Sequence, residues 1–131
     1  PLYKKLYYRT GELLCDIPFN YNEGNGSVKI FNKDGETFDE INIKNGKLDG
    51  KHKVFGFLED DRYEREVFTF QEGKYISGME NIDEDMRNTF YPFLNHISKK
   101  NGNVSRENYL QELIVYRREM MYCEDEWDEE E

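Results

Sequence analysis

Apolar and polar residues alternate along the first part of the chain, in short runs separated by glycine-containing turns. The runs at 27–31 and 37–43 show this period of two, which places successive side chains on opposite faces of a β-strand. Asp-Gly and Asn-Gly pairs at Gly35 and Gly46 supply the positive φ that tight hairpin turns require. The pattern predicts about seven strands over residues 2–77, joined as an antiparallel meander.

The strands and turns recur with an offset of 24 residues. Tyr7, Phe31 and Phe55 form one aromatic series, and Gly11 and Gly35 form a series of turn glycines. A period of this length is typical of supersecondary units that stack side by side and share one core. We therefore expect the strands to belong to repeated hairpins.

After Gly78 the spacing of apolar residues changes to three and four, which predicts helices over 83–98 and 105–123. We expect Pro92 to kink or split the first helix and Ser105 to cap the second. The main stripe of the second helix is Leu110, Leu113, Ile114, Arg117 and Met121. A sheet of repeats cannot leave its last edge and its apolar face in water, so we expect both helices to pack on it.

These elements predict an α+β fold, in which an antiparallel β-meander of stacked repeat hairpins is followed by two C-terminal α-helices. We expect a single domain over 1–123, with the repeat sheet over 2–78 and an acidic tail over 124–131. Aromatic residues make up 15% of the 131 residues, which suits half-buried strands and argues against disorder.

The net charge of -10 narrows the classes of partner. Phosphate binding needs an excess of Lys and Arg, so we expect neither nucleic acid nor an anionic membrane as a partner. A basic protein is the natural electrostatic match. No apolar run approaches a membrane span, no signal peptide is visible, and we expect Cys15 and Cys123 to be reduced thiols of a cytoplasmic protein.

Two segments carry a resemblance to a known family. "YYRTGEL" at 7–13 and "IKNGKLDG" at 43–50 resemble the MORN-repeat variant of bacterial antitoxin-like proteins, and the likeness covers about residues 2–78. The resemblance implies hairpins stacked into one twisted sheet that serves as a protein-binding or immunity scaffold. It implies no catalytic residues.

Residues that could carry chemistry are few and scattered. The two histidines, His52 and His96, have no metal ligand at local spacing, and we expect each to be exposed or satisfied by hydrogen bonds. The segment 97–108 imitates a calcium loop, but it has isoleucine at the first position and lysine at the third, so we expect a simple interhelical turn. We expect no catalytic residue, no cofactor and no metal ion.

The third repeat unit offers the best candidate for a binding site. Its segment "FLEDDRYE" has no glycine, and we expect the turn at Asp60 and Asp61. The residues that we expect to contact a partner are Glu59, Asp60, Asp61, Glu64 and, in the tail, Trp127. The sequence therefore favours a non-catalytic protein-binding protein, such as a small acidic inhibitor or immunity protein that neutralises a basic toxin. A scaffold module with no inhibitory role is the alternative, and the oligomeric state stays open.

Overall fold

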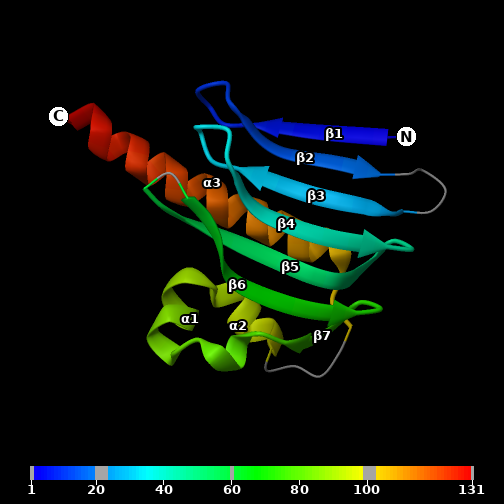
Figure 1. Cartoon of the computed structure of the whole chain (residues 1–131). Helices are drawn as coiled ribbons and strands as arrows, with labels where there is room; N and C mark the ends of the chain where they lie inside the picture. The colour runs from blue at the N-terminus through cyan, green and yellow to red at the C-terminus, as the bar shows by residue number, and fades with distance from the viewer. Residues whose placement is uncertain (1, 20–23, 60, 99–102, 131) are drawn as a thin grey trace.

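A computed structural model describes residues 2–19, 24–59, 61–98 and 103–130. Seven strands form one antiparallel sheet in which the spatial order follows the chain order, as Figure 1 shows. The strands are β1 (Leu2–Tyr7), β2 (Leu13–Phe19), β3 (Gly26–Phe31), β4 (Thr37–Lys44), β5 (Lys47–Leu58), β6 (Asp61–Gln71) and β7 (Lys74–Ser77). The predicted α+β meander is therefore confirmed.

The repeat is visible in the strand register, because the hairpins β1–β2, β3–β4 and β5–β6 each contain a β-bulge at an equivalent position. The register shifts directly after Leu6, Ile30 and Val54, which are spaced 24 residues apart. The extra residues on the opposite strands are Leu14, Phe38 and Arg65. The first two of these are 24 residues apart and the last two are 27 apart, so the third hairpin is longer by three residues.

The glycines at the turn within the second hairpin and at the turn between the second and third hairpins have the expected backbone. Gly35 has a φ of 86° and Gly46 a φ of 75°, which confirms the left-handed backbone that these turns need. The third hairpin differs from the expectation by one position. Leu58 pairs with Asp61, so Asp61 belongs to β6 and not to the turn, because the longer hairpin continues its ladder to Leu58. Asp60 itself lies outside the described residues.

The helical part contains the 3₁₀ helix η1 (Met79–Asn81) and the helices α1 (Glu84–Phe90), α2 (Pro92–Ser98) and α3 (Arg106–Glu130). Pro92 splits the first predicted helix in two, as its missing N–H requires. Ser105 caps α3, because its Oγ accepts a hydrogen bond of 3.4 Å from the backbone N–H of Asn108.

Helix α3 is longer than the sequence predicted. It continues to Glu130, so the expected end at 123 is wrong and most of the expected acidic tail is helical. The physical reason is that residues 124–130 include neither glycine nor proline, and glutamate is a good helix former. The side chains of 120–131 lie outside the described part of the chain.

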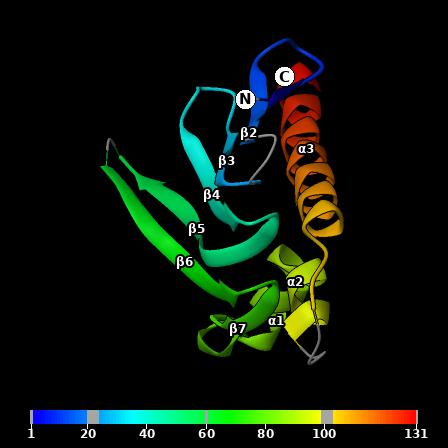
Figure 2. The same cartoon turned by 90° about the vertical axis from the view of Figure 1, so that its right-hand side faces the viewer.

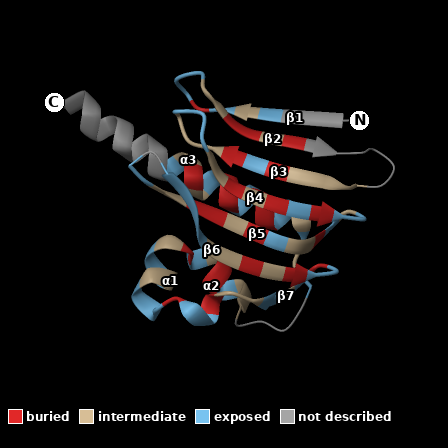
Figure 3. Cartoon of the chain, viewed as in Figure 1, coloured by how far each residue is buried: buried red, intermediate tan, exposed pale blue. Residues whose placement is uncertain are grey.

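The helices cover one face of the sheet. Helix α3 crosses this face beneath the first strands, while α1 and α2 lie at the β7 end (Figures 1 and 2). The core lies between the two layers, and Figure 3 shows buried residues recurring along the strands. The predicted stripe of α3 contributes Leu110, Leu113, Ile114 and Arg117 to it. Within the described residues, no helix is long and apolar enough to cross a membrane.

Candidate functional site

The predicted contact residues lie on the long hairpin of the third unit, whose distal part at 55–65 we call the β5–β6 arm. Figure 2 shows the arm projecting away from the helices, and Figure 3 shows that its end is exposed. Glu59, Asp61 and Glu64 are all exposed on this arm. Trp127 lies on α3, far along the chain, and its side chain is among those not described.

The acidic residues of the arm have different surroundings. The carboxylate of Glu64 lies 3.1 Å from Lys53 Nζ, so its charge is partly neutralised by the neighbouring strand. Glu59 and Asp61 have no ion-pair partner within the described part of the chain. Among the predicted carboxylates that the structure describes, these two are the ones without an ion-pair partner.

The arm also exposes apolar surface beside these carboxylates. Leu58 is 70% exposed and Tyr63 is 48% exposed. The Tyr63 ring lies against Gly56, its cross-strand neighbour, where a Cβ atom would stand only 2.6 Å from the ring carbon Cζ. By register, Leu58, Asp61 and Tyr63 share one face of the arm. The arm therefore presents an aliphatic side chain, an aromatic ring and a carboxylate together.

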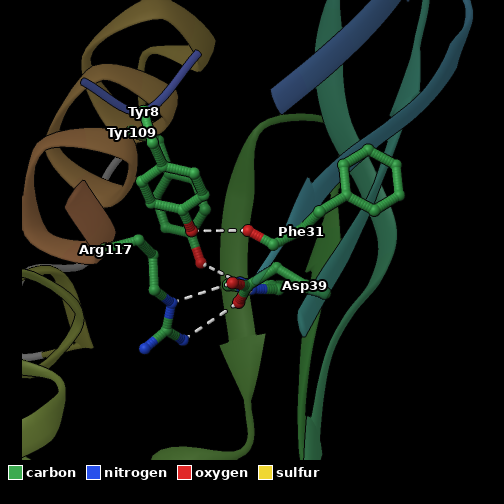
Figure 4. A network of polar contacts seen from close by, with 6 residues as sticks. Tyr8, Phe31, Asp39, Tyr109 and Arg117 are labelled. Carbon is green, nitrogen blue, oxygen red and sulfur yellow. Dashed lines mark hydrogen bonds and ion pairs between the residues drawn. The ribbon is translucent and has the colours of Figure 1, made fainter. Parts of the chain in front are cut away.

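A second group of polar residues, which we call the Asp39 network, lies inside the core. It consists of Asp39 of β4, His52 of β5, and Tyr109 and Arg117 of α3, joined by hydrogen bonds (Figure 4). Asp39, His52 and Tyr109 are fully buried and Arg117 is 3% exposed. Arg117 donates from Nε to Asp39 Oδ2 at 2.8 Å and from Nη2 to Asp39 Oδ1 at 3.0 Å. His52 Nε2 lies 2.8 Å from Asp39 Oδ1, and His52 Nδ1 lies 2.6 Å from the Tyr109 hydroxyl.

The charges in this network stabilise one another. Burial alone would raise the pKa of the Asp39 carboxyl, but Arg117 and His52 outweigh that effect and hold the pKa below its usual value. Burial would lower the pKa of Arg117, and the Asp39 carboxylate raises it instead. Burial, followed by the nearby Asp39 carboxylate, raises the pKa of Tyr109 well above its usual value. Tyr109 therefore keeps its hydroxyl proton, and the two ring nitrogens of His52 link this hydroxyl to the Asp39 carboxylate.

The Asp39 network joins the sheet to α3, and none of its four side chains is more than 3% exposed. The ring of Phe38, the bulged residue of β4, packs against the network, because the Arg117 guanidinium lies 4.3 Å from its centroid. The nearby Tyr8 hydroxyl donates to the carbonyl of Phe31 at 2.6 Å and ties the first unit to the second (Figure 4). These contacts give the network a structural role in fixing α3 on the sheet.

Only part of this arrangement could be predicted from the sequence. Each histidine was expected to be exposed or satisfied by hydrogen bonds, and His52 is hydrogen-bonded in the core while His96 is exposed on α2. The pairing of Asp39 with Arg117 was not predicted, although an arginine inside an apolar stripe was a signal for a buried carboxylate. The described residues contain no cluster of three or more His, Cys, Asp or Glu suited to a metal ion. Positions 99–102 of the expected interhelical turn lie outside the described residues.

In comparisons with known proteins, no family model, no curated protein and no solved structure matches the chain. The class of protein is therefore defined by its own fold and site. The chain is an α+β repeat protein whose third hairpin is lengthened into an exposed, partly acidic arm.

Proposed function

We propose that this is a non-catalytic protein-binding protein that contacts a basic partner through the β5–β6 arm. The observation that carries the proposal is the three-residue extension of the third hairpin, which keeps the bulge of the other units and then extends beyond them. Function tends to lie where a sequence departs from its own structural rule. The distal part of this hairpin contributes little to the core, since residues 61–65 of β6 are all exposed.

The chemistry of the arm favours a protein as the partner. Leu58 and Tyr63 offer an apolar anchor, and tyrosine is enriched among the residues that dominate binding energy. Glu59 and Asp61 surround this anchor with negative charge, on a chain whose net charge is -10. Complementary charge raises the association rate and selects among partners. A basic surface with a shallow apolar hollow is the matching partner.

The narrower assignment is a small cytoplasmic inhibitor or immunity protein that neutralises a basic toxin. The resemblance of residues 2–78 to MORN-repeat variants of antitoxin-like proteins supports it, because that family implies a binding scaffold without catalysis. The competing assignment is a structural scaffold module whose acidic charge serves only solubility. Both assignments are compatible with the same fold. They differ in whether the β5–β6 arm binds a partner.

The test compares two variants with equal charge change. Glu59→Lys/Asp61→Lys reverses the two available carboxylates of the arm, and Asp34→Lys/Glu72→Lys reverses two exposed carboxylates in other turns. A partner is captured from the cells that produce the protein, and its association rate with each variant is measured at low and high salt. We expect the arm variant to associate about tenfold more slowly at low salt and with a flatter salt dependence.

The control variant should keep the rate of the wild-type protein within about twofold, since distant exposed charges are largely screened. Tyr63→Ala should chiefly speed dissociation, because it removes the apolar anchor without changing charge. If both charge variants slow association equally, the arm has no special role and the scaffold assignment replaces the inhibitor assignment.

A further inference from the structure

The two edges of the sheet differ in whether another described segment pairs with them. At the β7 edge, Lys74 forms a bridge with Asn103, and the N–H of Val104 donates to the carbonyl of Gly73 at 2.6 Å. At the opposite edge, no described strand pairs with the outer side of β1. An open strand edge is a template for the backbone of another chain.

The internal repeat indicates which kind of strand fits the open edge of β1. Leu6, Ile30 and Val54 occupy the same position in the three units. Ile30 and Val54 are fully buried between two neighbouring strands, whereas Leu6 has a strand on one side only and is half-buried. An added strand would give Leu6 the surroundings that its two equivalents already have.

A hollow of about 530 Å³ lies beneath this edge, between the first two strands and α3. Its apolar lining includes Leu6, Ile17, Leu110 and Ile114. Arg118 also lines it. The hollow can therefore take an apolar side chain from whatever covers the edge.

We propose that the outer edge of β1 and this hollow bind an extended segment of another protein, which adds to the sheet as an antiparallel strand. The pairing of β2 with β3 gives the pattern, because Cys15 lies opposite Ile30 and Asp16 opposite Lys29. One repeat earlier, Leu6 replaces Ile30 and Lys5 replaces Lys29.

The added segment therefore alternates an apolar residue opposite Leu6, which enters the hollow, with an acidic residue opposite the exposed Lys5. A second copy of the chain fits this edge less well. In the two most complete registers of an antiparallel β1 pair that keeps both inner faces on one side, either Lys4 or Lys5 lies opposite its own copy, and like charges in that position repel. This binding site is separate from the β5–β6 arm.

The experiment uses a peptide with the sequence of β2, residues 13–19, in which Cys15 is replaced by serine to prevent oxidation. Amide hydrogen exchange of the full chain, read by NMR, is measured with and without the peptide. We expect exchange of the β1 amides to slow by at least about tenfold, because new backbone hydrogen bonds protect them. The amides of β7, whose edge is already covered, should not change.

A charge swap tests the register. A peptide that also carries Asp16→Lys should bind the wild-type protein about fivefold more weakly, and the protein variant Lys5→Glu should restore its binding. The matched control is Lys51→Glu, which places the same charge change at an exposed position of β5 and should leave both affinities within about twofold.

Three results would overturn the proposal. The first is absence of peptide binding into the millimolar range, and the second is protection that appears away from β1. The third is protection of β1 without peptide that grows with protein concentration, together with a dimer in analytical ultracentrifugation. This last result would assign the edge to a second copy of the chain.

Discussion

Replacement of Arg117 by methionine tests the structural role assigned to the Asp39 network. The guanidinium makes two hydrogen bonds to the Asp39 carboxylate, at 2.8 and 3.0 Å, from a position that is 3% exposed. Methionine has a similar reach but neither the charge nor the donors. The fully buried carboxylate of Asp39 would keep only His52 as a partner. Removal of one partner from a buried ion pair costs about 3–5 kcal/mol.

The expected loss is large for a chain of this size. Domains are stabilised by about 5–15 kcal/mol in total, so the variant approaches the limit of stable folding. With an unfolding entropy of about 2.1 cal/mol/K per residue, the 131 residues give about 0.28 kcal/mol/K. A loss of about 3–5 kcal/mol then lowers the Tm by about 11–18 °C. Urea titration followed by circular dichroism, together with thermal melting, measures both quantities.

A double variant separates the ion pair from simple loss of packing. In Asp39→Asn/Arg117→Met both charges are absent, and the side-chain oxygen of the introduced amide still accepts from His52 Nε2. We expect the double variant to be more stable than Arg117→Met alone by about 1–3 kcal/mol, because no unpaired charge is buried. Arg118→Met, on the next residue of α3, is the control and should cost under about 1 kcal/mol. Additive effects of the two single substitutions would refute the proposed coupling.

The remaining predictions concern a glycine and the acid sensitivity of the fold. Gly78 has a φ of 130°, and a Cβ there would lie 2.5 Å from the carbonyl oxygen of Val67, so Gly78→Ala should cost at least about 2 kcal/mol in urea unfolding. Gly35→Ala, where nothing lies within 4 Å, should cost about 1 kcal/mol, and equal losses would argue against the clash. The lowered pKa of Asp39 stabilises the fold above the unfolded value of about 3.9, and this stabilisation is lost as the pH falls toward the folded pKa. The stability difference between wild type and Asp39→Asn should therefore shrink as the pH falls below the unfolded value of about 3.9, and a constant difference would contradict the assignment.

The sheet could be predicted from the sequence because its signals are local. Alternation of apolar residues and the glycines of the turns act within a few positions, and the offset of 24 residues ties the units together. The position of the third turn could not be fixed in the same way. Its segment at 57–64 has no turn glycine, and only pairing with the opposite strand shows that the ladder runs on to Leu58.

The Asp39 network could not be predicted because its parts are far apart in sequence. Asp39 and Arg117 are separated by 78 positions and meet only after α3 packs on the sheet. The bulge at Phe38 also matters, since it shifts the register of β4 just before the carboxylate. A pattern of apolar residues identifies the inner faces, but it does not state which polar residues will meet between them.

The position of the bulges explains how the third hairpin can be longer than the other two within the same fold. In each unit the bulge follows an equivalent residue of the core, Leu6, Ile30 or Val54. Residues beyond this point in the third unit are mostly exposed, so insertions there alter neither the Asp39 network nor the contacts of α3. Exposed substitutions usually change stability by under about 0.5 kcal/mol. The length and charge of the β5–β6 arm can therefore adapt to a partner independently of the stability of the sheet that carries it.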